Sequence, residues 1–158
     1  MLSGYYFDFE YLRPEDREPY NAFLKKAAQR LHAERLLIST ALAPKTSASQ
    51  TGQWYTAHDY RAHGEIVDFV VIMTYEWGYS AGPPMAVSPI GPVRQVLEYA
   101  KTEIPANKIM MGQNLYGYDW TLPFVKGGAY ARAISPQTAI SLARENHAFI
   151  EYDYTAQA

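Results

Sequence analysis

The sequence contains no cysteine. This excludes disulfide bonds, a thiol nucleophile and a metal site built on thiolates, but it leaves the cellular compartment open. No apolar run is long enough to span a membrane, and we expect neither a signal peptide in this chain nor a membrane partner. Cationic residues are not in excess either, because 14 lysines and arginines face 16 aspartates and glutamates, for a net charge of −2. Without a basic patch, nucleic acid is not an expected partner.

Aromatic residues, by contrast, are plentiful: they form 15% of the chain and include 14 tyrosines. A tyrosine ring has a flat apolar face and a polar tip, which complements the apolar face and hydroxyl edge of a sugar. The simpler interpretation is a tyrosine-rich core and surface, which composition alone favours. With 158 residues, of which 48% are apolar and 19% charged, the chain is expected to form a single globular domain over residues 1–158.

The segment over residues 4–10 alternates in the manner of a strand whose side chains point to opposite faces. Asp8 and Glu10 share one face with Tyr6, whereas Phe7 and Phe9 point toward an apolar layer. Two carboxylates on one face need a reason, because burying unpaired charge is costly. They are either a pair with a chemical role or a charged strand end that arginine or solvent satisfies.

The rest of the chain alternates helical and strand-like segments. The expected helices cover residues 17–33, 58–63, 92–102 and 135–145, with Asp16 as N-cap of the first and Ser135 of the last. The expected buried strands cover residues 36–43, 66–73 and 108–112, with a final strand or part of a hairpin at 149–152. Long loops are expected over residues 76–90 and 115–130. This order predicts an α/β fold with a parallel sheet, in which functional loops follow the carboxyl ends of the strands.

Two further motifs follow the opening strand in order: Met73-Thr74-Tyr75-Glu76, and Leu115-Tyr116-Gly117-Tyr118-Asp119-Trp120. Together with residues 4–10, they resemble the motifs of the fourth, sixth and seventh strands of glycoside hydrolase family 18, the chitinase-like barrels. The similarity is closest to the spore-germination branch of cortical-fragment-lytic N-acetylglucosaminidases. The segments that carry this similarity are residues 8–11, 41–46, 57–60, 73–78, 82–87 and 116–123.

The resemblance implies an incomplete TIM (β/α)8 barrel that corresponds to strands 4–7 with their helices. It also implies a glycosidase that hydrolyses β-1,4-linked N-acetylglucosamine polymers, spore-cortex peptidoglycan or chitin, by a substrate-assisted retaining mechanism. Glu10 would be the general acid and base, Asp8 would orient the acetamido group of the sugar, and the Tyr75 hydroxyl would bond the acetamido oxygen. The alternative is an inactive fragment, or a carbohydrate-binding remnant without turnover.

The same resemblance suggests substrate-binding residues, for which simple loop packing is the competing interpretation. Aromatic rings would stack on sugars and polar groups would bond hydroxyls; the set is Met73, Glu76, Trp77, Asn114, Tyr116, Tyr118, Asp119 and Trp120. The four histidines lack metal-ligand spacing, so we expect core or surface positions for them and no metal or other cofactor: His32, His58, His63 and His147.

The chain departs from the family pattern in two ways. Ser3 and Tyr6 stand at the first two acidic positions of the catalytic strand, and Glu76 stands where most of the family has aspartate. In extent, the chain begins at the equivalent of the fourth strand and ends after the seventh, whereas a full barrel needs about 250 residues. A half-barrel has open sheet edges and an exposed apolar inner face, so we expect a homo-oligomer. The resemblance places the protein in the spore or cell envelope, or outside the cell.

Overall fold

The computed structural model describes residues 3–158, which divide into two compact units. The first unit runs to Thr74 and resumes at Gln95–Gly112; the second comprises Tyr75–Arg94 and Gln113–Ala158. Helix α3 (Ile90–Glu103) contributes residues to both. No helix in this described part of the chain is long and apolar enough to cross a lipid bilayer.

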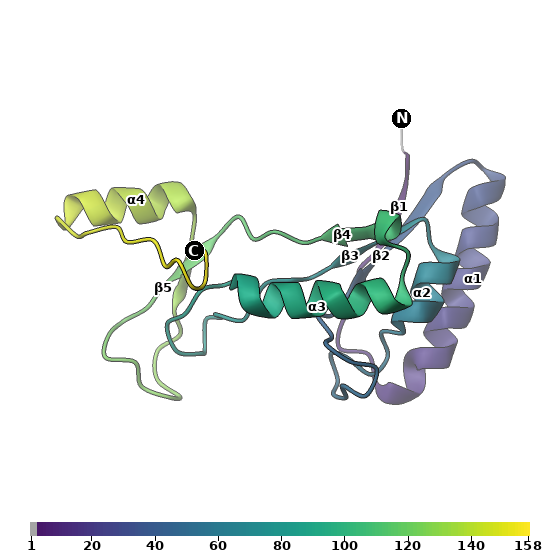
Figure 1. The fold of residues 1–158 in the computed structure, drawn as a ribbon, viewed down its shortest axis with the longest axis horizontal. Coiled ribbons are helices and arrows are strands. Elements are labelled where there is room, and N and C mark those ends of the chain that lie inside the picture. The colour runs from purple at the N-terminus through teal and green to yellow at the C-terminus, as the bar shows by residue number, and fades with distance from the viewer. Residues whose placement is uncertain (1–2) are drawn as a thin grey trace. The chain divides into compact units, whose positions relative to one another are not determined.

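The first unit is built on a parallel four-stranded sheet (Figure 1). Its strands lie in chain order and are β1 (Gly4–Phe7), β2 (Leu37–Leu42), β3 (Phe69–Ile72) and β4 (Ile109–Met111). Within the described residues, β1 pairs only with β2 and β4 only with β3, so the sheet is a barrel segment that does not close. The predicted parallel α/β architecture is confirmed, and all four carboxyl ends meet at one edge.

Helix α1 (Arg17–Ala33) has the bounds that its apolar stripe predicts, after a short 3-10 turn, η1 (Pro14–Asp16). Tyr20, Leu24 and Ala28 are buried, which is the i, i+4, i+8 spacing of one helix face. Asp16 occupies the N-cap position, but its carboxylate bonds the backbone and guanidinium of Arg13 instead of the helix. Helix α2 (Tyr60–Ile66) lies two residues later than expected, because Asp59 is its N-cap.

Two strands are less buried than their apolar sequences predict. In β3, Val70 and Ile72 are buried, whereas Phe69 and Val71 are half-exposed. In β4, Met110 is 50% exposed and Met111 is 46% exposed. The prediction of burial on both faces was wrong, because only one face of this sheet is covered along β3 and because β4 is an edge strand.

The second unit contains a small antiparallel hairpin, β5 (Gly117–Asp119) with β6 (Arg132–Ile134), followed by α4 (Pro136–Glu145). The hairpin lies partly inside the segment that was expected to be a loop, since three-residue strands are too short to establish an alternating pattern. Ser135 caps α4 as predicted, with its hydroxyl accepting from the Thr138 N–H at 3.1 Å. Residues 149–152 form no strand among the described residues, which overturns that expectation. A second 3-10 turn, η2 (Ala106–Lys108), precedes β4 in the first unit.

Candidate active site

Asp8 and Glu10 lie in the first unit, directly after the last residue of β1. The rings of Phe7 and Phe9 both pack against Phe23 of α1, with centroids 5.2 Å and 5.7 Å away. Since neighbouring side chains of an extended segment alternate, this packing leaves Asp8 and Glu10 on the opposite side, where both are exposed. The shared packing of Phe7 and Phe9 is as the alternation predicts, although the strand ends at Phe7 rather than at Glu10.

The two carboxyl groups differ in their electrostatic setting. Partial burial raises the pKa of Glu10, and the neighbouring Asp8 carboxylate raises it further. A raised pKa keeps a carboxylic acid protonated at a pH where an ordinary glutamate has lost its proton. Glu10 is accordingly suited to donating a proton next to a carboxylate that can stabilise positive charge.

His58 also contributes to this region. From the sequence we predicted only a core or surface position for it. The residue is only 2% exposed, and its Nε2 lies 2.9 Å from the carbonyl oxygen of Phe9, the residue between Asp8 and Glu10 in the sequence. The Ala57-His58-Asp59-Tyr60 motif pointed to this histidine. Its contact with Phe9 could not be predicted, because the two residues are 49 apart in the chain and no local pattern links them. His63 is buried as well, so both histidines occupy core positions.

The motif after β3 is divided between the two units. Met73 belongs to the first unit and is buried, and its N–H donates to the Leu42 carbonyl oxygen at 2.9 Å. Tyr75, Glu76 and Trp77 begin the second unit and are half-buried. Glu76 has a left-handed backbone with φ 69°, which is uncommon for a residue with a Cβ atom.

Glu76 gathers the two tyrosines of the later aromatic motif. The hydroxyls of Tyr116 and Tyr118 both donate to Glu76 Oε1, the latter at 2.9 Å. Burial and the bond to Glu76 raise the pKa of Tyr118 to about 12, and the same causes raise the pKa of Tyr116. Both phenols thus remain protonated donors. The structure brings these three predicted residues together, with the hydroxyls directed to the carboxylate.

The remaining predicted residues of the second unit are also held by local contacts. Asn114 accepts from the Ser88 hydroxyl at 2.8 Å, Asp119 pairs with Arg132 across the hairpin at 3.2 Å, and Trp120 Nε1 donates to the Gly82 carbonyl at 2.9 Å. These contacts agree with simple loop packing, the alternative to sugar binding for these side chains. Four of the predicted residues nevertheless line one pocket of about 360 Å³: Asn114, Tyr116, Tyr118 and Trp120.

Metal binding has no candidate centre in residues 3–158. No group of three or more histidine, aspartate or glutamate side chains in this range is placed to hold a metal ion.

Comparison with known proteins gives a consistent set of matches. A family model described as "Glycosyl hydrolases family 18" matches residues 2–157. The chain is 74% identical over 153 residues to the "Cortical fragment-lytic enzyme" of Bacillus subtilis (strain 168), a match that covers 97% of this chain and 36% of that protein. The crystal structure of the Bacillus cereus spore cortex-lytic enzyme SleL has a TM-score of 0.94 and 57% identity, covering 99% of this chain and 36% of that one.

A more distant match extends the comparison beyond spore proteins. The crystal structure of a chitinase from Chromobacterium violaceum has a TM-score of 0.88 and 27% identity, covering 98% of this chain and 47% of that one. The chain spans 36% of the length of the cortical fragment-lytic enzymes that it matches.

Proposed function

This chain belongs to glycosyl hydrolase family 18, and from that membership we propose that residues 1–158 form one partial catalytic domain of a glycosidase. Its substrates would be β-1,4-linked N-acetylglucosamine polymers. Spore-cortex peptidoglycan is preferred over chitin, because the 74% and 59% identical relatives are named cortical fragment-lytic enzymes. The same names support a place in the spore envelope.

One observation carries the proposal: Asp8 and Glu10 follow β1 at its carboxyl end, close enough for the Asp8 carboxylate to raise the pKa of Glu10. Two carboxylates in a glycosidase usually divide the roles of acid and nucleophile, but family 18 instead uses the substrate's own acetamido group as nucleophile. A single acid–base residue that keeps its proton to a higher pH, with a neighbouring anion, suits that mechanism.

In the first step, the acetamido oxygen attacks the anomeric carbon of its own sugar ring while Glu10 donates its proton to the leaving glycosidic oxygen. The bond from the anomeric carbon to that oxygen breaks, and the ring carries a cyclic, positively charged intermediate that Asp8 stabilises. In the second step, the Glu10 carboxylate takes a proton from water as the water oxygen attacks the anomeric carbon and restores the acetamide. By the family pattern, the Tyr75 hydroxyl would donate to the acetamido oxygen. The residues that would bind the sugar are Met73, Glu76, Trp77, Asn114, Tyr116, Tyr118, Asp119 and Trp120.

The proposal is tested by release of a chromophore from an N-acetylglucosamine oligomer. The parent chain should release it, and Glu10→Gln should lower the rate by about 10²–10⁴-fold, because an amide cannot transfer the proton. Glu34→Gln makes the same chemical change at the exposed C-cap of α1 and should leave the rate unchanged.

Absence of release by a folded parent chain at high protein concentration would contradict turnover by these 158 residues. Calorimetric titration of that inactive chain with the same oligomer then decides whether it retains carbohydrate binding.

We also propose self-association of this chain. Among the described residues, β1 and β4 are the two edge strands of the sheet, and both expose large apolar side chains, which favours pairing between copies. The assembly is therefore expected to be a homo-oligomer in which these sheet surfaces are covered.

A further inference from the structure

The hydrogen-bonded ladder of β1 ends before the two carboxylates that the proposed function requires. The register pairs Phe7 with Thr40 as its last match, so Asp8, Phe9 and Glu10 continue beyond the ladder. A segment that carries an acid–base residue must be held in place, since small displacements of a reacting group are costly in rate.

The imidazole of His58 supplies a link at this point. The Ala43 N–H donates to Nδ1 at 2.8 Å, and Nε2 lies 2.9 Å from the Phe9 carbonyl oxygen. Because a backbone N–H only donates and a carbonyl only accepts, the ring must be the neutral tautomer with its proton on Nε2. The ring thereby joins the carboxyl ends of β1 and β2, and the carbonyl that it binds belongs to the peptide between Phe9 and Glu10.

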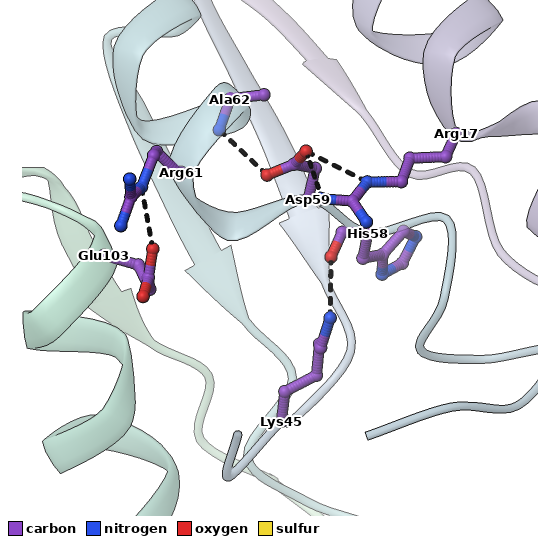
Figure 2. A network of polar contacts seen from close by, with 7 residues as sticks. All are labelled: Arg17, Lys45, His58, Asp59, Arg61, Ala62 and Glu103. Carbon is purple, nitrogen blue, oxygen red and sulfur yellow. Dashed lines mark hydrogen bonds and ion pairs between the residues drawn. The ribbon is translucent and has the colours of Figure 1, made fainter. Parts of the chain in front are cut away.

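The backbone at His58 and the next residue is itself anchored. Its carbonyl oxygen accepts from Lys45 Nζ at 3.3 Å, and the next residue, Asp59, accepts from the Ala62 N–H at 3.1 Å as the N-cap of α2 (Figure 2). Arg17 at the start of α1 binds Asp59 Oδ2 through two nitrogens, at 2.6 and 3.0 Å. The ring is consequently attached to a backbone that two helices hold.

Tyr60 adds a parallel link to the same strand end. Its hydroxyl donates to the Ala43 carbonyl oxygen at 2.6 Å and accepts from the Lys45 N–H at 3.0 Å. The Ala43 peptide groups are thus bound by both His58 and Tyr60, so the end of β2 is a firm support for the ring.

We propose that His58 is a positioning residue that holds the Asp8–Glu10 segment in place through the Phe9 carbonyl. The inference rests on the proposed function, because it assigns a role toward the acid–base residue of that function. His58 touches neither substrate nor reacting atoms; it acts through the backbone that carries Glu10.

The neutral state that this role needs is consistent with the surroundings of the ring. Burial lowers the pKa of His58, the bond to Phe9 opposes that shift, Lys45 lowers the pKa further and Asp8 raises it. Tyr20 and His63 also face the ring, with centroids 6.4 Å and 6.2 Å away.

Two substitutions separate the two bonds of the ring. In His58→Asn, the amide oxygen falls near the position of Nδ1 and can accept from Ala43, while the donor to Phe9 is lost. In His58→Gln, the amide nitrogen reaches the position of Nε2 and keeps that donor. His63→Asn is the matched control, because His63 is equally buried in α2 and its Nδ1 pairs with the Thr40 hydroxyl rather than with the Phe9 segment.

The readout is the pKa of Glu10, measured by NMR on protein with ¹³C-labelled glutamate carboxyls and assigned with Glu10→Gln. We expect His58→Asn to move this pKa toward the ordinary value of about 4.3. His58→Gln and His63→Asn should keep it near that of the parent. An unchanged pKa in His58→Asn, or an equal change in His63→Asn, would overturn the proposal.

Two further measurements complete the test. In the unsubstituted chain, ¹⁵N chemical shifts of the imidazole should show that the proton of His58 is on Nε2. Finding the proton on Nδ1 instead would overturn the proposal, and this measurement does not depend on any variant folding. Where the parent releases chromophore, His58→Asn should lower kcat by about 10- to 100-fold with KM changed less than about twofold, and His58→Gln should recover most of kcat. Failure of the parent to turn over substrate would count against the proposed function alone, because the NMR readouts need no activity.

Discussion

Two histidines in the first unit show how single residues are adapted to burial. His63 is fully buried, and its Nδ1 lies 3.0 Å from the Thr40 hydroxyl, while His58 uses both ring nitrogens on backbone groups. Each partner satisfies a polar atom that would otherwise be costly to remove from water. Protonation would add a charge inside the unit, so these residues make the fold sensitive to acid.

His63 provides a quantitative prediction for stability. Burial and the neighbouring His58 lower its pKa while Asp59 opposes the shift, and the net result is a pKa of about 3, whereas an unfolded histidine titrates near 6.5. Between these two values the unfolded chain binds the proton and the folded chain does not, so the free energy of unfolding falls as the pH falls. The slope from this residue should approach about 1.4 kcal/mol per pH unit. Urea unfolding from pH 7.5 to pH 4.5 measures it.

The matched variants identify the source of that slope. His63→Asn should show a shallower decline than the parent, whereas His147→Asn, at an exposed loop position, should follow the parent. A His63→Asn profile parallel to that of the parent would refute the assignment.

At the level of loops and helices, the segment between β3 and α3 is more ordered than its glycines and prolines suggest. The Trp77 N–H donates to the Val87 carbonyl at 3.1 Å, and the Gly78 N–H donates to the Ala86 carbonyl at 3.0 Å. A Cβ atom at Gly78 would stand 2.2 Å from the Met85 carbonyl oxygen. The long loop therefore folds back on itself, and the close approach of its two arms requires glycine at this position.

Gly78→Ala should consequently lower the free energy of unfolding by about 1–3 kcal/mol, the usual range for overpacking against backbone. Gly91→Ala is the matched control: it lies in α3 with no atom within 4 Å of the added carbon, and it should raise the free energy by about 0.5–1 kcal/mol. Denaturant unfolding of both variants measures these changes. An unchanged free energy of unfolding in Gly78→Ala would show that the two arms of the loop can separate without destabilising the protein.

The elements themselves were predictable to different degrees. The bounds of α1 and the cap of α4 followed from local signals, a repeated apolar stripe and a Ser-Pro pair. The β5–β6 hairpin did not, because its identity depends on pairing Gly117 with Ile134 rather than on either strand alone. The burial of β4 also escaped prediction, since an apolar run does not reveal whether a neighbouring strand covers it.

For the molecule as a whole, we expect the exposed edge strands of the four-stranded sheet to influence self-association in solution. Tyr5 and Tyr6 on β1 are exposed, as are Met110 and Met111 on β4. An edge strand that presents exposed apolar side chains invites pairing with another chain.

Size-exclusion chromatography with light scattering should therefore find dimers or larger species at micromolar concentration. Met110→Lys places a charge on the edge strand and should shift the population toward monomer, whereas Met85→Lys, an exposed methionine of the other unit, should not. A stable, soluble monomer of the parent chain at all concentrations would contradict self-association.

The sequence by itself determined the order of β1 to β4 and α1 to α4, the parallel α/β class, and the alternation by which Asp8 and Glu10 are expected on one side of the opening segment. These follow from spacings of two to four residues, which local backbone geometry converts directly into faces. The tertiary structure alone decided which distant side chains form hydrogen bonds with these segments. His58 meets the Phe9 carbonyl across 49 residues, and Tyr116 meets Glu76 across 40. Such hydrogen bonds form only once the chain has folded, because no local spacing specifies which distant donor will reach a given acceptor.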